Sequence, residues 1–286
     1  MPERPLLDDA ACVALLRFAL PRLQLRWEGF RRVRRQVCRR IARRMREIGV
    51  PDAAAYRARL ESDPAEWRRL DALCRITISR CFRDRSVFET LETRVLPVLA
   101  ARARAAGRTT LRAWCAGCAS GEEAYSLAAL WASALAPRAN GLRLAIVATD
   151  SDPQLIERAR RGRFRASSLR EVPAEALALG FERSEPGYVV RAALRELIEF
   201  RCQDLREEMP DGPFDLISCR NLAFTYFGAE LQREILARLC GRLQERGALV
   251  VGLHESLPAE QGALAPWAGT RAVYERAADP PPRGRR

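Results

Sequence analysis

The 286-residue chain has no lysine, one histidine and no long apolar run, and each shortage narrows its possible functions. With His254 as the single histidine, neither a histidine-dependent triad nor a metal centre with several histidine ligands is expected. No apolar run approaches the roughly 20 residues of a membrane-spanning helix. The run at 12–20 is short and interrupted by Arg17, so we expect no signal peptide and a cytoplasmic protein.

Charge and cysteine content also bound the interpretation. The net charge is +13, and all 49 basic residues are arginines, which we attribute to a composition bias rather than to a functional need. The nine cysteines predict reduced thiols. Cys115 and Cys118 have the spacing of a metal-binding pair, but no second pair completes a site. We therefore interpret them as small core residues and predict no metal.

The most basic part of the chain lies at 30–48, where apolar residues recur every three or four positions and predict one helix. The remaining positions are mostly arginines, which form either a solvated face or a surface that binds an acidic protein. RNA is a third possibility, although no RNA-binding motif accompanies the helix. We favour protein docking, through Arg35, Arg39, Arg40, Arg43, Arg44 and Arg46.

A glycine turn is the most informative motif. The apolar run 111–116 predicts a strand, small residues including Gly117 and Gly121 follow, and a helix begins at Glu122. This arrangement lets a nucleotide-like ligand approach the backbone closely. A phosphate binder leaves the helix N-terminus free for the anion, whereas Glu122 and Glu123 occupy it here. The acids suit a cationic, hydroxyl-rich ligand such as S-adenosylmethionine, or they only complement the helix dipole.

A second acid strengthens the ligand interpretation. The buried-strand pattern at 142–149 ends in Asp150, and Asp152-Pro153 begins a helix. An acid at the end of the second strand, roughly 20–30 residues after the glycine turn, binds ribose hydroxyls in α/β cofactor folds. Asp150 is therefore our candidate for the ribose.

Along the chain, helices are followed by an alternation of strands and helices. Residues 1–84 predict an all-helical basic domain, 85–110 a linking helix, 111–278 an α/β domain and 279–286 a disordered tail. The expected strands are 111–116, 142–149, 195–201, 213–219 and 246–252, with an edge strand at 271–276. The expected helices are 86–106, 122–136, 153–161, 171–179 and 229–244. The alternation predicts a mostly parallel sheet with helices on both faces.

Six blocks in order resemble the chemotaxis receptor glutamate methyltransferases, the CheR family. They are the basic segment 39–46, the segment 76–84, the glycine turn with 121–126, the strand end 148–152, and the segments 214–221 and 252–257. The resemblance covers about 25–276. It implies a small all-α N-terminal domain, a class I Rossmann-like methyltransferase domain, and S-adenosylmethionine held between them.

The resemblance also implies roles for individual residues. Glu123 and Asp150 would face the methionine and ribose ends of the cofactor, and Gly117 would line its turn. Arg83 and Tyr226 would orient the substrate carboxylate. The other cofactor-binding positions implied by the resemblance are Thr77, Ser79, Arg83, Asp204, Leu205, Arg220 and Asn221.

Several positions depart from the family pattern. Asp204 stands where asparagine is common, and one extra residue separates Asn221 from Tyr226. The segment 181–200, which in some members carries a small β-subdomain that grips a receptor tail, is short, so we expect no such docking.

The implied reaction is methyl transfer from S-adenosylmethionine to glutamate side chains of a chemoreceptor or a related acidic signalling protein, by a monomer. A glutamate carboxylate is already ionised at neutral pH, so the reaction needs no general base. Two alternatives remain: a degenerate scaffold that only binds the cofactor, and a methyltransferase for RNA or a small molecule on the same fold.

Overall fold

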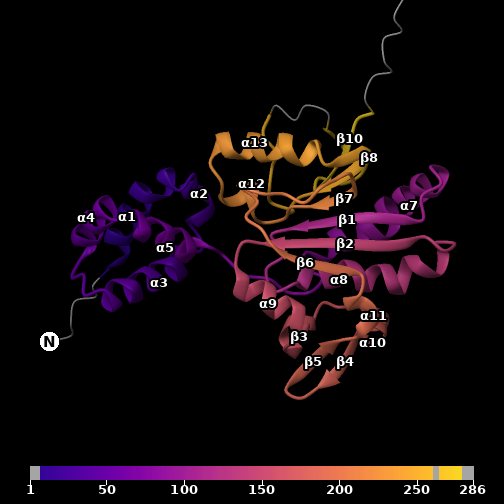
Figure 1. Cartoon of the computed structure of the whole chain (residues 1–286), viewed down its shortest axis with the longest axis horizontal. Coiled ribbons are helices and arrows are strands. Elements are labelled where there is room, and N and C mark those ends of the chain that lie inside the picture. Colours follow the sequence, from indigo (N-terminus) through magenta and orange to yellow (C-terminus); the bar gives the residue numbers. More distant parts are fainter. Residues whose placement is uncertain (1–6, 260–263, 279–286) are drawn as a thin grey trace, which may run out of the picture. The chain divides into compact units, whose positions relative to one another are not determined.

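The protein is described by a computed structural model that covers residues 7–259 and 264–278. Its contacts divide into two compact units (Figure 1). One unit extends to Thr77 and also contains Thr225–Gln232, which we call the helical unit. The other comprises Ile78–Phe224 and the chain from Arg233, which we call the methyltransferase unit by its expected role. The tail expected to be disordered, 279–286, lies outside the described residues.

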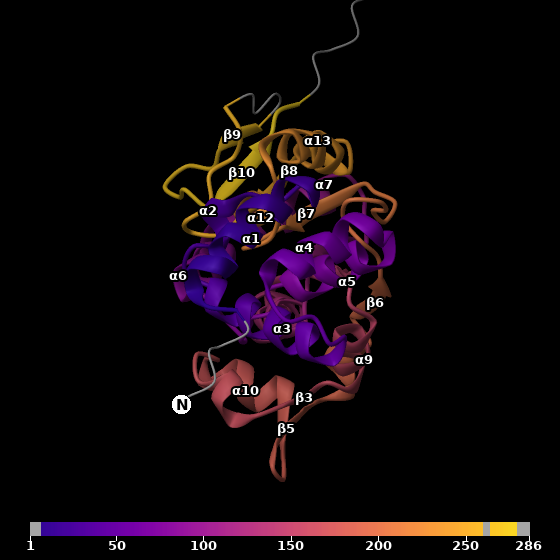
Figure 2. The same cartoon turned by 90° about the vertical axis from the view of Figure 1, so that its left-hand side faces the viewer.

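The helices of the helical unit are short (Figure 2), and three of them begin with a side-chain cap. Asp8, Asp52 and Asp63 each accept a hydrogen bond from a backbone N–H in the first turn of the helix that follows. The elements are α1 (Asp9–Arg22), α2 (Trp27–Phe30), α3 (Arg34–Glu47), α4 (Ala53–Ser62) and α5 (Pro64–Cys74).

The single helix predicted at 30–48 is wrong, because a turn interrupts it between α2 and α3. The apolar stripe itself is confirmed: Val37, Ile41 and Met45 are fully buried. The periodicity therefore identified the buried face but not the break.

A disulfide joins α1 to α3 through Cys12 and Cys38, which are 26 residues apart in sequence. The prediction that all cysteines are reduced thiols is thus wrong for this pair. Sequence spacing could not reveal the bond, because it depends on how α1 packs against α3.

The helical unit also takes in a segment from much later in the chain. Leu25 forms an antiparallel bridge with Phe227, and the N–H of Arg26 donates to the carbonyl of Tyr226 at 2.8 Å. The N–H of Gly228 donates to Gln24 at 2.7 Å. Residues 225–232, which the sequence analysis assigned to the α/β domain, therefore pack with the helices.

The methyltransferase unit is built on a seven-stranded sheet in the order β6-β2-β1-β7-β8-β10-β9. Neighbours from β6 to β8 are parallel, and β10 is antiparallel to both β8 and β9. The strands are β1 (Thr110–Ala116), β2 (Arg143–Asp150), β6 (Ile198–Cys202), β7 (Phe214–Ser218), β8 (Leu243–Val250), β9 (Leu264–Pro266) and β10 (Val273–Arg276). The predicted mostly parallel sheet is confirmed, but the edge strand is β9 rather than the predicted 271–276.

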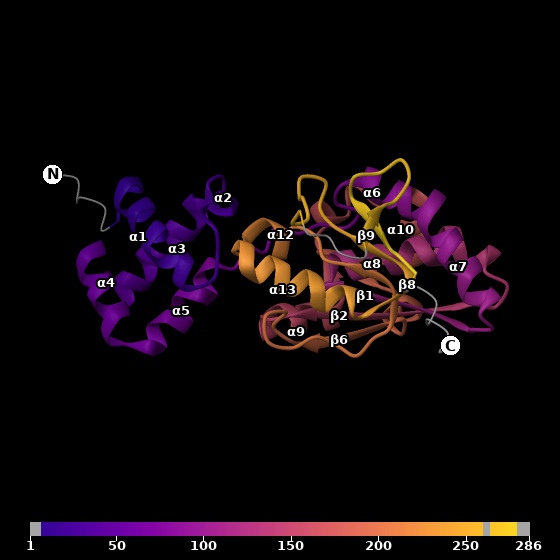
Figure 3. The same ribbon diagram turned by 90° about the horizontal axis from the view of Figure 1, so that it is seen from above.

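Helices lie on both sides of this sheet (Figures 1 and 3). The helices after residue 84 are α6 (Arg85–Thr90), α7 (Leu96–Ala105), α8 (Glu122–Leu130), α9 (Pro153–Arg161), α10 (Ala174–Gly180), α11 (Ala192–Arg195), α12 (Ala223–Tyr226) and α13 (Ala229–Cys240), of which the end of α12 and the start of α13 belong to the helical unit. Shorter π- and 3₁₀-helical turns are η1 (Leu91–Val95), η2 (Trp131–Leu135), η3 (Ala136–Arg138) and η4 (Ala166–Leu169). The predicted helices at 86–106 and 122–136 each contain a π-helical turn. The predicted helix at 229–244 is too long, because β8 already begins at Leu243.

Strand β1 shows how the sheet forms its core. Leu111, Ala113 and Cys115 alternate toward one face and join a buried cluster with α7 and α8. Trp114 points to the opposite face, where its ring lies 5.8 Å from that of Phe214. Burial on both faces explains why β1 appears in the sequence as a continuous apolar run.

A second, three-stranded antiparallel sheet follows α9, in the order β3-β5-β4. Its strands are β3 (Arg163–Phe164), β4 (Phe181–Ser184) and β5 (Gly187–Val190). The sequence analysis placed no strands at β4 and β5, and from the shortness of 181–200 it expected no docking of a receptor tail, which stays a prediction. A two-residue connection between β4 and β5 makes a hairpin possible in this length.

Candidate functional site

The candidate site lies at the carboxyl ends of β1, β2, β6 and β7 within the methyltransferase unit. The strand order reverses at β1, which has β2 on one side and β7 on the other. Open α/β sheets bind ligands in the crevice beside such a reversal.

The turn between β1 and α8 has the left-handed backbone that its glycines predict. Gly117 has φ +76° and Gly121 has φ +88°, a region in which a side chain is strained. A Cβ on Gly121 would lie 3.1 Å from each of three packed side chains. The N–H groups of Gly117 and Cys118 both donate to the carbonyl of Thr149, which fixes the turn against the end of β2.

Asp150 is the last residue of β2 and fixes the same turn through its side chain. Its two carboxylate oxygens accept from the N–H of Ala119 at 2.9 Å and the N–H of Asp152 at 3.0 Å. The structure thus brings Asp150 to the glycine turn, as the sequence predicts, and adds a structural role that was not foreseen.

Arg220 connects three separate parts of the chain. Its guanidinium donates to Glu123 at 3.0 Å, to Asp84 at 2.8 Å and to the carbonyl of Arg83 at 2.8 Å. Its side chain is 2% exposed, so the two ion pairs are formed largely out of water. Arg220 therefore ties the start of α8 to the segment before α6, and Glu123 already has a partner within the protein.

The segment 78–84 is held in place by hydrogen bonds between backbone and side-chain groups. The N–H of Phe82 donates to Ser126 on α8 at 2.8 Å, and Arg83 donates to the carbonyl of Ile78 at 2.7 Å. Phe82 and Asp84 have positive φ, which is uncommon for residues other than glycine. Strained, over-determined backbone of this kind is typical of functional segments.

Asn221 is positioned by an acid that the sequence analysis did not single out. The carboxylate of Glu255 accepts from the N–H of Asn221 at 2.7 Å and from the N–H of Gly252 at 2.6 Å. A Cβ on Gly252 would lie 2.9 Å from the Asn221 amide oxygen and 2.8 Å from the Glu255 carboxylate, so a larger residue there would displace both side chains.

Two buried acceptors at this edge have no hydrogen-bond partner among the described residues: Glu122 Oε2 and Gln203 Oε1. Glu122 is 6% exposed, and burial raises its pKa even though a hydrogen bond with Ser79 opposes the shift. The N–H of Gln203 donates to the carbonyl of Asp150 at 3.0 Å, which places it beside β2. An unsatisfied buried acceptor costs about 1–3 kcal/mol, so a ligand that donates hydrogen bonds would be favoured here.

Asp204 and Leu205 follow β6. Asp204 accepts from the Arg206 guanidinium at 2.7 Å, and Leu205 is buried. The cation offsets the extra negative charge that aspartate adds at this position.

Two of the predicted site residues belong to the helical unit. Tyr226 packs there against Phe30, with ring centroids 5.2 Å apart, and Thr77 is the last residue of its N-terminal part. Their roles at the cofactor and substrate stay predictions.

The arginines of α3 fall into two groups. Arg44 donates two hydrogen bonds, at 3.0 and 2.7 Å, to the buried carboxylate of Glu66. Arg40 donates to the carbonyls of Leu73 and Arg75 at the end of α5. Both therefore hold α3 to α5. The other four predicted docking residues are exposed on one side of α3, and we call them the arginine stripe: Arg35, Arg39, Arg43 and Arg46.

The sequence analysis missed Asp84, Gln203 and Glu255 as individual site residues. Asp84 and Glu255 lie inside blocks that carry the family resemblance, so block membership was the available signal. Gln203 could have been found from its position directly after β6, because the residues that follow parallel strands lie together at the carboxyl edge of the sheet.

Burial raises the pKa of both the Cys115 and Cys118 thiols, which keeps them protonated and fits core residues rather than metal ligands.

Across residues 7–259 and 264–278 no cluster of three candidate metal ligands is present. No helix in the same ranges is long and apolar enough to cross a membrane.

Two family models match the chain: "CheR methyltransferase, SAM binding domain" at residues 77–273 and "CheR methyltransferase, all-alpha domain" at 33–71. An uncharacterized 104.1 kDa protein of Rhodobacter capsulatus is 37% identical over 77% of this chain, which spans 23% of that relative.

Two other relatives are chemotaxis methyltransferases by name. The chemotaxis protein methyltransferase 1 of Pseudomonas aeruginosa is 36% identical over 62% of this chain and 65% of its own length. The chemotaxis protein methyltransferase of Salmonella typhimurium is 34% identical over 78% and 76%. Among solved structures, an N-methyltransferase NodS of Bradyrhizobium japonicum is 16% identical over 68% of this chain and 99% of that chain, at a TM-score of 0.34, too low to bear on function.

Proposed function

The chain belongs to the CheR methyltransferase family, and on that premise we propose that it transfers a methyl group from S-adenosylmethionine to glutamate carboxylates of a chemoreceptor or a related signalling protein. Residues 77–273 match the cofactor-binding domain of the family. The single observation that supports the proposal best is the glycine turn bounded by Glu122, Glu123 and Asp150.

The residues at this edge fit the cofactor. S-adenosylmethionine carries an ammonium group, a sulfonium and a ribose diol, all of which favour acidic or acceptor groups. The left-handed glycines allow the tight turn and its packing, since a Cβ on Gly117 would collide with Leu222 and one on Gly121 would meet three packed side chains. The unpaired Glu122 and Gln203 oxygens are acceptors within the described residues. We assign the ribose to Asp150 and the methionine end to Glu123, whose carboxylate Arg220 orients. Gly117, Ser79, Thr77, Leu205 and Asn221 complete the proposed set.

When bound, the cofactor supplies an electrophilic methyl group. The chain's own task is to align the substrate carboxylate and to exclude water from it. Arg83 makes no ion pair with an acid in the described part of the chain and uses one of its five donors on Ile78. We propose that Arg83 and Tyr226 orient the carboxylate, which is ionised at neutral pH and needs no base.

The arginine stripe is the proposed docking surface for the acidic substrate protein. Arg35, Arg39 and Arg46 are exposed, whereas Arg40 and Arg44 of the predicted set have structural partners. Removing Arg35 and Arg39 together should weaken substrate binding without loosening α3, while Arg44→Ala should destabilise the helical unit. We further propose a cytoplasmic location, where the cofactor is available.

A transfer assay tests the proposed function. The protein is incubated with methyl-labelled S-adenosylmethionine and receptor-enriched membranes, and the label is tested for release by base, since carboxyl methyl esters are base-labile. Base-labile label on protein supports the proposal. Cofactor binding without transfer would instead indicate a scaffold, and base-stable label in RNA or a small molecule would indicate another substrate class.

Single substitutions test the assigned roles. Arg83→Ala and Tyr226→Phe should lower turnover more than cofactor affinity, because both residues are assigned to the carboxylate. Arg85→Ala is the matched control, since Arg85 is an exposed arginine paired with Glu89. Unchanged turnover in both test variants would refute the assignment.

A further inference from the structure

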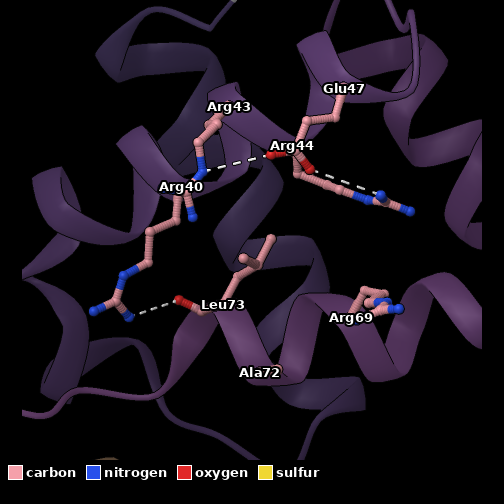
Figure 4. A pocket seen from close by; sticks show the side chains of 7 residues that line it. All are labelled: Arg40, Arg43, Arg44, Glu47, Arg69, Ala72 and Leu73. Atoms are coloured by element: carbon pink, nitrogen blue, oxygen red, sulfur yellow. Dashed lines mark hydrogen bonds and ion pairs between the residues drawn. The ribbon is translucent and has the colours of Figure 1, made fainter. Parts of the chain in front are cut away.

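The helical unit contains a cavity of about 340 Å³ that shares only Arg43 with the arginine stripe. Two helix faces line it (Figure 4): Arg40, Arg43, Arg44 and Glu47 from α3, and Arg69, Ala72 and Leu73 from α5. Each set follows three- and four-residue spacing, so each is one face of its helix. We propose that this cavity, which we call the α3–α5 pocket, binds a small organic phosphate.

The charge of the lining is the first argument. Four arginines face one glutamate, which leaves a formal charge of +3, or +2 if the buried Glu66 behind Arg44 is counted. A single carboxylate would leave this charge uncompensated, whereas a diphosphate would offset it. Guanidinium groups bind phosphate oxygens in a forked geometry, which makes arginine the usual residue for such recognition.

Preorganisation is the second argument. Arg44 is held by Glu66, and Arg40 is held by the carbonyls at the end of α5, so the α3 wall of the pocket contains two fixed arginine side chains. Arg43 and Arg69 keep donors for a ligand. The Glu47 carboxylate lies 3.6 Å from Arg43, and Arg69 is exposed and makes no ion pair within the described ranges. Each helix therefore contributes one exposed arginine that can donate to an anion.

Size and polarity define the ligand further. A volume of about 340 Å³ is at the small end of ligand pockets, which span roughly 300–1,000 Å³. Ala72 and Leu73 add an apolar surface beside the arginines, as Figure 4 shows. The pocket thus suits a phosphate or diphosphate group that carries a modest organic body.

The experiment is calorimetric titration of the full chain with pyrophosphate, GDP and guanosine, with S-adenosylhomocysteine in excess to occupy the proposed cofactor site. We expect pyrophosphate and GDP to bind one site per chain and guanosine not to bind. Arg69→Ala should weaken binding by about 10-fold. Arg68→Ala removes the same charge from the neighbouring exposed position of α5, outside the pocket lining, and should change affinity by less than about 2-fold.

Three outcomes would overturn the proposal. The first is that neither pyrophosphate nor GDP gives heat of binding. The second is that Arg68→Ala and Arg69→Ala lose the same affinity for phosphate, which would indicate an adventitious ion only. The third is that the protein binds an acidic peptide but no phosphate. The methyl-transfer assay is separate, because Arg69 is assigned no part in it, so failure of one proposal is distinguishable from failure of the other.

Discussion

Replacing Arg220 by methionine should destabilise the methyltransferase unit and weaken cofactor binding. The Arg220 side chain is 2% exposed and bonds to Glu123, Asp84 and the Arg83 carbonyl. Methionine approximates the length of the arginine stem and can pack near Phe88, over which the guanidinium now lies. The substitution therefore removes the cation while disturbing the volume little.

The magnitude follows from what is left behind. Removing one partner of a buried ion pair costs about 3–5 kcal/mol, because the other charge stays buried and unpaired. The Glu123 and Asp84 side chains are 22% and 25% exposed, so water can partly solvate both carboxylates. We therefore expect a lower loss, about 2–3 kcal/mol in the free energy of unfolding.

The assay is urea unfolding followed by tryptophan fluorescence, with Trp114 as a buried probe in the methyltransferase unit. Because the chain has two units, the curves are fitted with separate transitions. Arg85→Met is the control, since the Arg85 and Glu89 side chains are 70% and 59% exposed, and it should cost less than about 0.5 kcal/mol.

A second variant isolates the electrostatic part. Combining Arg220→Met with Glu123→Gln and Asp84→Asn leaves no unpaired carboxylate, so this triple variant should be more stable than Arg220→Met alone. The reasoning is refuted if the free energy of unfolding of Arg220→Met lies within about 0.5 kcal/mol of that of the original protein. It is also refuted if the triple variant is no more stable than Arg220→Met.

Three further predictions concern other parts of the chain. The hydrogen bond from Arg44 lowers the pKa of Glu66. The ionised Glu66 therefore stabilises the fold above the unfolded-chain pKa of about 4.3, and this stabilisation is lost as the pH falls through the lowered value. In thermal unfolding from pH 7 to pH 3, the difference in stability between Glu66→Gln and the original protein should become smaller. Gly121→Ala should lower stability and cofactor affinity more than Gly141→Ala, because both glycines have positive φ but only Gly121 has neighbours within 4 Å, and calorimetry with S-adenosylhomocysteine would contradict this if both variants bound alike. Replacing Cys12 and Cys38 by serine should destabilise the helical unit by about 3 kcal/mol in oxidising buffer. Most of that difference should disappear once reductant is added, apart from the cost of a serine hydroxyl at the buried Cys12 position, as measured by urea unfolding.

The sequence predicted the features that depend on local pattern. The buried stripe of α3, the glycine turn and Asp150 at the end of β2 are each encoded by neighbouring residues, through spacing, the need for positive φ and strand polarity. Pattern of this kind survives in a single sequence because it involves at most a few turns of chain.

Features that depend on contacts between distant residues were not predictable. The bond of Cys12 to Cys38, the edge position of β9 and the Arg220 cluster each require knowledge of packing. Arg40 and Arg44 illustrate the same limit: their positions on α3 resemble those of the exposed arginines, and only α5 gives them a structural role.

The return of the chain at Thr225–Gln232 has a practical consequence for anyone dissecting the protein. A fragment that stops before the first strand would lack Phe227 and Gly228, so Leu25 and Gln24 would lose their backbone partners. The helical unit is therefore not formed by one continuous stretch of sequence. Exchanging it with that of another family member requires moving both the N-terminal helices and residues 225–232. Tyr226, which we propose to orient the substrate carboxylate, would be exchanged together with these helices.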